Sequence, residues 1–172
     1  MAIIKTIKPE DATGKVKEIY SMFNQRMGMV PSGIQLFSAS PEILEAQAGF
    51  MAVSMAQKKF SPALLAFIRI LVSVEHKCQY CIDVNVGMLM NSGMSKEAID
   101  ASIADPNKTP LDEKEKAILL FVLKSVKEPL SIDSSQIEKL RTLGWDDKDI
   151  FEAVYFGALE ITIDIIFNTF KV

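Results

Sequence analysis

Hydrophobic residues recur along the chain with the three- and four-residue spacing of an α-helix. From Val16 to Met27, apolar side chains fall at positions i, i+3, i+4, i+7 and i+11, and Gly28 follows them. The pairs Ser40-Pro41 and Ser61-Pro62 are each typical of an N-cap followed by proline at the first helical position. No stretch shows the strict alternation of a half-buried strand. The pattern predicts an all-α fold of packed helical hairpins.

The second half of the chain contains further helix signals of the same kind. Thr109-Pro110 predicts a helix start, and Asp133 with Gln136 resembles a capping box before a helix that ends at Gly144. Asp146 is then expected to cap the last and longest helix. On that helix, four polar residues share one sector and leave a broad apolar face: Glu152, Glu160, Asp164 and Asn168.

Composition narrows the class of protein. The 172 residues suit one domain, and a hydrophobic content of 49% is enough to build a large core. Because 19 basic residues nearly balance 22 acidic ones, without a basic stripe, we expect no nucleic-acid partner. The 10 Phe and 9 Met residues suggest contacts between copies of the chain. Two cysteines and one histidine exclude both a disulfide framework and a four-ligand zinc site within one chain.

Two apolar stretches are candidates for membrane-spanning helices. The stretch 63–74 is short and is interrupted by Arg69, whereas the stretch 150–170 is long but contains Glu152, Glu160 and Asp164. Each such acid costs about 2.5–3.5 kcal/mol at the bilayer centre. The first residues have no apolar run followed by a small-residue cleavage site. We therefore expect a soluble, cytoplasmic protein without membrane contact.

One segment carries most of the candidate chemistry. Cys78, Cys81 and the only histidine, His76, lie within six residues of one another. Side chains three apart in a helix have Cβ atoms about 5–6 Å apart, whereas a disulfide needs about 3.5–4.5 Å. The pair is therefore best placed at a helix start, where the helix dipole would also lower a thiol pKa. Glu75 is near enough in sequence to accept a proton. The spacing predicts a redox-active dithiol.

Two other interpretations of the cysteines stay open. Buried thiols in a methionine-rich core often act only as small hydrophobic residues. A metal half-site with His76 as third ligand is a second alternative, which would require ligands from another chain.

The block from Ser73 to Cys81 resembles the core of the carboxymuconolactone decarboxylase and alkylhydroperoxidase AhpD-like proteins. It follows an apolar helix after Ser61-Pro62 and contains Cys-x-Tyr-Cys. The segment from Ala12 to Tyr20, with Val30-Pro31, resembles the amino-terminal arm of the peroxidase-related branch. The resemblance extends over residues 9–165.

Membership in this family would imply a single AhpD-like helical domain, with arm helices in residues 1–60 and the core in residues 61–172. It would also imply a homo-oligomer, as a dimer, trimer or hexamer. The substrate would be a peroxide or a disulfide, and a protein would serve as reductant. Neither a cofactor nor a metal is expected. In the family, a Glu/His proton relay assists the cysteine pair.

The sequence departs from the family at that relay. Asn85 stands where the relay histidine is expected, and Ala66 stands where the glutamate is expected. Neither side chain can carry a proton. Glu75 and His76 are the candidate replacements. Which thiol attacks stays open: the resemblance favours Cys81 as the relay-side cysteine, with Cys78 as the more exposed partner for exchange.

Two functions follow from this comparison with the family. The first is a thiol–disulfide oxidoreductase with peroxidase-related activity through Cys78 and Cys81. The alternative is a family member with little or no catalysis that acts as an oligomeric scaffold or small-ligand binder. A lactone decarboxylase ranks third, because no residue pattern indicates a lactone site.

Overall fold

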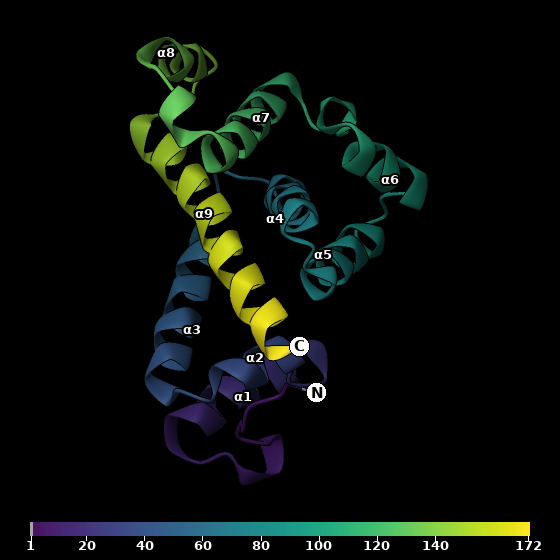
Figure 1. Cartoon of the computed structure of the whole chain (residues 1–172), viewed down its shortest axis with the longest axis vertical. Helices are drawn as coiled ribbons and strands as arrows, with labels where there is room; N and C mark the ends of the chain where they lie inside the picture. Colours follow the sequence, from purple (N-terminus) through teal and green to yellow (C-terminus); the bar gives the residue numbers. More distant parts are fainter. Residues whose placement is uncertain (1) are drawn as a thin grey trace. The chain divides into compact units, whose positions relative to one another are not determined.

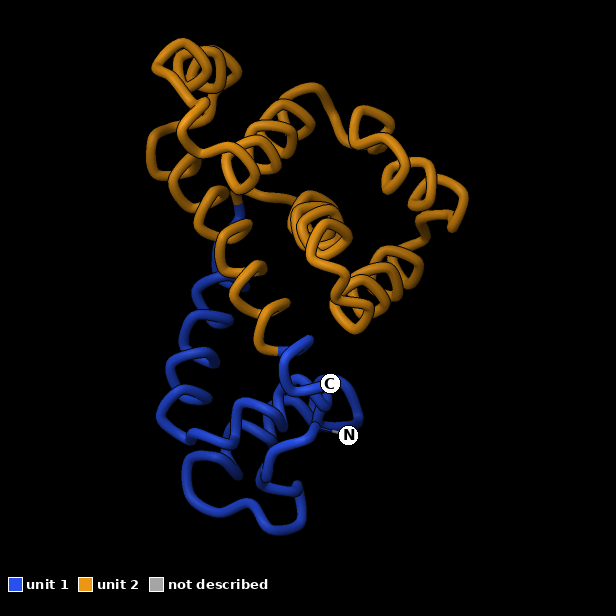
Figure 2. The backbone as a smooth tube through the Cα atoms, viewed as in Figure 1, with its two compact units in different colours: residues 1–58, 167–172 blue, residues 59–166 orange. Residues whose placement is uncertain are grey.

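The computed structural model describes residues 2–172, which form nine α-helices and three short 3-10 helices without any strand (Figure 1). The predicted all-α fold is confirmed. The chain forms two compact units (Figure 2). The first comprises the residues up to Lys58 together with Phe167–Val172, and the second comprises Lys59–Ile166.

The first unit contains the amino-terminal helices. They are η1 (Pro9–Asp11), α1 (Gly14–Met27), α2 (Ser32–Phe37) and α3 (Pro41–Ala56). As the sequence predicts, α1 ends at Gly28, whose φ of 72° is left-handed and suits glycine. The Tyr20 hydroxyl donates to the Ile7 carbonyl at 2.8 Å, and the Ile7 amide donates to Ser38 Oγ at 2.8 Å. These bonds fix the extended start of the chain against α1 and α2.

The second unit contains the cysteines and is built around α4. Its elements are α4 (Pro62–His76), α5 (Gln79–Asn91), α6 (Lys96–Ala104), η2 (Pro106–Lys108), α7 (Glu113–Lys127), η3 (Pro129–Ser131), α8 (Ser134–Thr142) and most of α9 (Asp147–Phe170). In Figure 1, α5, α6 and α7 lie around α4, and all three contact it. Nine of the fifteen α4 residues are buried, from Leu64 to Ser73. The apolar run that could have suggested a membrane helix is thus the core of this unit.

Most helix starts lie where the capping signals predict them. Ser61 Oγ accepts from the Leu64 amide at 3.0 Å, and Glu115 of α7 binds both the amide and the hydroxyl of Ser61. The predicted start at Thr109-Pro110 is wrong. Thr109 ends η2 instead, and α7 begins after Asp112, whose carboxylate accepts from the Glu115 amide at 2.7 Å. A carboxylate acceptor next to the first free amides therefore decided the start.

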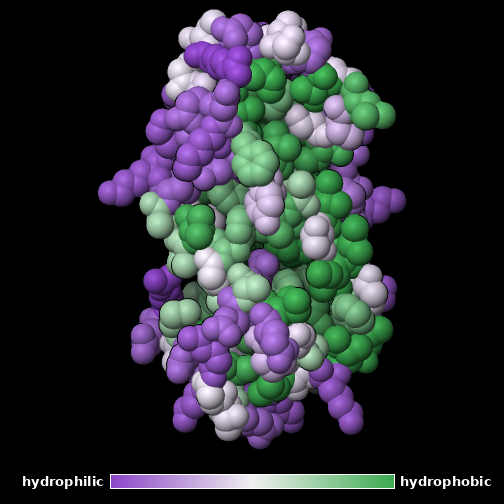
Figure 3. All heavy atoms as spheres, turned by 90° about the vertical axis from the view of Figure 1, so that its left-hand side faces the viewer, coloured by the Kyte–Doolittle hydropathy of each residue, from purple (hydrophilic) through white to green (hydrophobic). Residues whose placement is uncertain are grey.

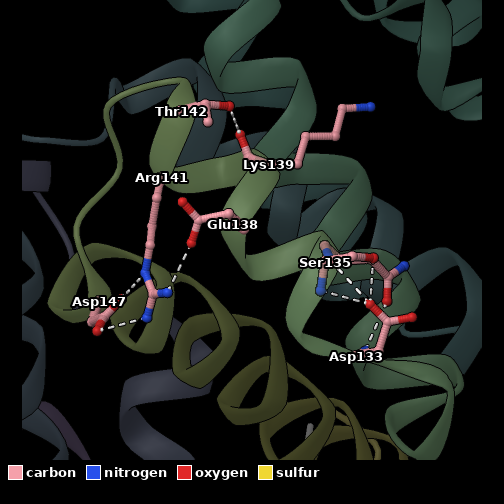
Figure 4. Close-up of polar contacts among 8 residues, drawn as sticks. Asp133, Ser135, Glu138, Lys139, Arg141, Thr142 and Asp147 are labelled. Atoms are coloured by element: carbon pink, nitrogen blue, oxygen red, sulfur yellow. Dashed lines mark hydrogen bonds and ion pairs between the residues drawn. The ribbon is translucent and has the colours of Figure 1, made fainter.

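The connection between α8 and α9 fixes how the last helix begins. Asp133 forms the predicted capping box with Gln136, and the Arg141 guanidinium binds Asp147 at 2.8 Å and 3.0 Å as well as Glu138 (Figure 4). Asp146 accepts from the Asp149 amide at 2.8 Å, so it caps α9 as expected. These contacts direct α9 back along the second unit.

Close packing against α7 determines which face of α9 is buried. A Cβ atom placed on Gly157 would lie only 2.6 Å from Val122 Cγ1 and 3.1 Å from Val126 Cγ1. Only glycine permits this approach. Glu160 lies three residues later, on the same side of the helix. None of the helices within residues 2–172 is both long and apolar enough to cross a membrane.

Candidate functional site: a thiol pair beside two buried acids

The two cysteines lie at the joint between α4 and α5. α4 ends at His76, and Lys77 adopts a left-handed conformation with φ 56°. Cys78 is the N-cap residue of α5, and its amide donates to the Ser73 carbonyl at 3.0 Å. Cys81 lies in the first turn of α5. The cysteines therefore occupy a helix start, as their spacing predicts.

The two thiols are reduced, adjacent and buried. Their Sγ atoms are 2.9 Å apart, and the exposed fractions are 1% for Cys78 and 4% for Cys81. Neither thiol is therefore an exposed partner for exchange, and their order of accessibility stays a prediction. A small side-chain rotation would bring the sulfurs to the bonding distance of a disulfide.

Two carboxyl groups of α9 lie beside this pair, inside the unit. Glu160 is 5% exposed and Asp164 is fully buried. The Ser73 hydroxyl lies 3.2 Å from Glu160 Oε1 and 2.8 Å from Asp164 Oδ1. A hydroxyl has a single hydrogen to donate, so it satisfies one of these carboxylates while the other bond requires a protonated carboxyl. The three side chains thus form a network that can store a proton.

Asp164 is the acid that lies near both sulfurs. One of its carboxylate oxygens and both Sγ atoms lie within 4.8 Å of one another. Its Oδ2 atom is buried and lacks a hydrogen-bond partner of ordinary geometry. Such an unsatisfied oxygen costs free energy in the folded state. Asp164 therefore has an acceptor atom available for a proton or another positive group.

The pKa values of both thiols are raised. Burial is the largest cause for each cysteine, since it disfavours the thiolate. For Cys81, the hydrogen bond with Cys78 and the charge of Glu160 raise the pKa further. For Cys78, the interaction with Cys81 acts in the opposite direction and lowers its pKa. The predicted lowering of a thiol pKa by the helix start is therefore wrong, because burial and the nearby acids outweigh the dipole.

The pKa of Glu160 is also raised. Burial is the main cause and the neighbouring charge of Asp164 is the second, whereas the charge of Arg69 on α4 opposes the shift. A raised pKa favours the protonated carboxyl. Glu160 can therefore hold a proton beside the thiol pair in the pH range where an ordinary glutamate has lost it.

The other two predicted site residues lie on a different part of the second unit. Glu75 is exposed, and its carboxylate pairs with Lys127 Nζ of α7 at 3.2 Å. His76 and Glu75 both line a surface pocket of about 710 Å³ between α4, α6 and α7. The structure thus brings Cys78 and Cys81 together and directs the Glu75 carboxylate to α7. The proton-transfer functions of Glu75 and His76 remain predictions.

Sequence reasoning did not assign Ser73, Glu160 and Asp164 to the site. The available signal was a pair of acids four residues apart in an otherwise apolar helix. That pattern identifies a shared sector but not the neighbour that the sector meets. Ala66 and Asn85, where the family relay is expected, are both buried, and Asn85 Nδ2 donates to the Cys81 carbonyl at 2.9 Å.

Known proteins share this fold. An uncharacterized peroxidase-related protein from Silicibacter sp. TM1040 is 19% identical, with all of this chain and 94% of the other aligned and a TM-score of 0.82. A peroxidase-related protein from Ralstonia eutropha JMP134 with an alkylhydroperoxidase AhpD core is 18% identical, covering 98% of this chain and 89% of the other (TM-score 0.86).

A third solved structure with this fold is a debrominase, Bmp8, in complex with 2,3,4-tribromopyrrole. It is 17% identical, covering 99% of this chain and 92% of the other (TM-score 0.77). Among curated proteins, none matches significantly.

The family model for the carboxymuconolactone decarboxylase family matches residues 41–122. This segment includes α4, the cysteine pair and the beginning of α5 that positions it. The match agrees with the resemblance read from Ser73 to Cys81. Residues 41–122 thus match the carboxymuconolactone decarboxylase family, and the chain shares the fold of solved structures that include an alkylhydroperoxidase AhpD core.

Proposed function

We propose that this protein is a thiol-dependent peroxidase that works through a Cys78–Cys81 disulfide. The observation that carries the proposal is the adjacency of two reduced thiols, 2.9 Å apart, to two buried carboxyl groups. Thiols supply the reducing electrons and carboxyl groups supply the proton transfer that peroxide cleavage needs. The peroxidase-related names of two structural neighbours agree with this class of reaction.

The first step consumes the peroxide. A Cys78 thiolate attacks one peroxide oxygen and breaks the O–O bond, which gives a Cys78 sulfenic acid and an alcohol or water. The Cys78 thiol proton passes to Asp164, which has the unpartnered Oδ2 atom. Protonated Glu160 supplies the proton that the leaving alkoxide needs, and Ser73 connects the two acids.

The second step forms the disulfide. The Cys81 sulfur attacks the sulfenic sulfur, which releases water after it takes the Cys81 proton. Each turnover therefore oxidises two thiols and reduces one peroxide. A dithiol or a protein thiol then returns the pair to the reduced state by exchange.

Cys78 suits the attacking position better than Cys81, although family resemblance favours Cys81. Asp164 raises the pKa of both thiols, but the hydrogen bond between them lowers the pKa of Cys78, whereas that bond and the charge of Glu160 raise the pKa of Cys81. The thiol with the less raised pKa ionises first. The other thiol keeps its proton and is available to resolve the intermediate.

The burial of both thiols favours one alternative, a family member with little catalysis that serves as a scaffold or small-ligand binder. Thiols with raised pKa values react slowly as nucleophiles. This alternative and the peroxidase differ in whether a folded protein consumes peroxide.

The test is to count thiols after the reduced protein meets hydrogen peroxide or an organic hydroperoxide. We expect two thiols to be lost per peroxide consumed, with an intramolecular disulfide as product. Cys78→Ser should abolish consumption, whereas Cys81→Ser should consume one equivalent and stop at a sulfenic acid that a dimedone probe traps. Thiols that survive peroxide in the folded chain but react after denaturation would instead support the non-catalytic alternative.

A further inference from the structure

The cluster around Asp164 has the donor atoms of a soft metal site. Two cysteine sulfurs and one carboxylate oxygen lie within 4.8 Å of one another, and all three residues are buried. Thiolate and carboxylate are ligands that Zn²⁺ accepts. Ligand atoms on a tetrahedral zinc ion lie about 3.3–3.8 Å apart, because its bonds are about 2.0–2.3 Å long. Small side-chain rotations that separate the sulfurs and draw in the carboxylate reach that geometry.

An independent observation points to a positive ligand at this place. Asp164 is fully buried, yet its Oδ2 atom has no hydrogen-bond partner. Buried carboxylate oxygens are normally paired, because desolvation without a partner is costly. Asn85 Oδ1, one helical turn after Cys81, is a second buried oxygen in the same condition. Two unsatisfied oxygens therefore accompany a pair of thiols.

The charges around the cluster also favour a cation. Four acidic groups meet here: the two thiols, Glu160 and Asp164. Arg69 is the basic side chain whose charge acts on them, and it acts on Glu160. A divalent ion would compensate thiolates that otherwise stay protonated in this acidic surrounding.

We propose that the reduced protein binds one thiophilic divalent cation, of which Zn²⁺ is the type, through Cys78, Cys81 and Asp164. The fourth position is left to water or to Glu160. From the sequence, a metal site at the two cysteines required His76 as a third ligand and further ligands from another chain. The fold supplies Asp164 from α9 as a third ligand within the same chain.

Such an ion would regulate the thiols, and this consequence rests on the proposed peroxidase function. The bound ion occupies both sulfurs and slows their attack on peroxide without preventing it. Oxidation converts two zinc-bound thiolates, one hydroperoxide and two protons into a disulfide, an alcohol, water and free Zn²⁺. The disulfide has no thiolate to offer, so oxidation releases the metal.

The binding test uses the reduced, full-length protein in metal-free buffer. We expect one equivalent of Co²⁺ to produce a sulfur-to-cobalt charge-transfer band, which Zn²⁺ then removes by displacement. Asp164→Asn should weaken Zn²⁺ binding by at least about 10-fold, because even the loss of a group that only hydrogen-bonds to a metal ligand lowers affinity by that factor. Competition with a chromophoric chelator measures the affinity. Cys78→Ser and Cys81→Ser should each remove the band.

A matched control separates this site from surface binding. Glu75→Gln removes an exposed carboxylate near the cysteines in sequence and should leave the band and the affinity unchanged. Circular dichroism confirms that each variant is folded. The proposal is overturned if the folded wild-type protein gives no charge-transfer band, or if Asp164→Asn binds Zn²⁺ as tightly as the wild type does. Peroxide consumption is measured separately on metal-free protein, so failure of one proposal leaves the other standing.

Discussion

The two faces of α9 each depart from the usual amphipathic pattern at a few positions. The face toward the core of the second unit carries Glu160 and Asp164, which are 5% and 0% exposed. The outer face carries a stripe with Phe151, Tyr155 and Ile165, which are 70%, 45% and 56% exposed. Hydrophobic side chains are visible at the surface over much of the view in Figure 3. The buried face is otherwise apolar, with Ile150, Ala153 and Phe156, so the two acids are the exception within it.

The acids on the buried face of α9 lower the stability of the fold. Buried acids and an unsatisfied Oδ2 destabilise the fold. Exposed aromatic and aliphatic residues cost little by themselves, but a contiguous apolar patch is typical of an interaction surface. The two faces of α9 therefore call for separate tests, one of the acids beside the thiols and one of the apolar stripe.

The largest predicted effect tests the inner face. Asp164→Asn keeps the size of the side chain but removes its basic oxygen. Because a well-placed proton acceptor is typically worth about 10²–10⁴-fold, we expect peroxide-driven disulfide formation to slow by about 100-fold. Stopped-flow thiol loss in metal-free protein measures the rate. Glu152→Gln is the matched control, since Glu152 lies on the same helix and pairs with Lys148 at 2.9 Å.

The same measurement decides between two sets of proton carriers. Glu75→Gln and His76→Gln should change the rate little, because the Glu75 carboxylate binds Lys127 and both residues line the separate surface pocket. If the rate falls further in these variants than in Asp164→Asn, Glu75 or His76 carries the proton instead of Asp164.

An intermediate effect concerns stability. The pKa of Glu160 is raised in the folded state, mainly by burial, so the folded protein holds this proton more tightly than the unfolded chain. Stability is therefore greatest below the ordinary glutamate pKa and falls as the pH rises through the folded value. Glu160→Gln should raise the urea midpoint at pH 8 relative to the wild type and lose this advantage at pH 4. A midpoint equally affected at both pH values would show that lost packing, not charge, is responsible.

The smallest effect on chemistry is expected from the outer face. The wild-type protein should elute as an assembly heavier than the 19.1 kDa chain when light scattering is combined with size-exclusion chromatography. Tyr155→Lys and Ile165→Lys should shift it toward the monomer, because they place a charge in the apolar stripe. Tyr155→Phe retains an apolar ring and should assemble normally. A wild-type monomer would contradict the prediction.

Local signals predicted most of the helices. Ser61, Asp133 and Asp146 each bind amides within the next few residues, so the cap and its partners lie in one short stretch of sequence. The failure at Thr109 has the same local origin, because Asp112 lies nearby and offers a stronger acceptor. Where two caps compete within one turn, composition alone does not rank them.

The sequence predicted only part of the site, because some of its residues are distant from one another in the chain. The sequence by itself determined that Cys78 and Cys81 meet, since they are three residues apart at a helix start. Only the tertiary structure decided their environment. Ser73 binds Glu160 and Asp164 across 87 and 91 residues, and this packing buries the thiols and raises their pKa values. Helix periodicity states which side chains share a face, whereas burial and charge depend on which distant helix covers that face.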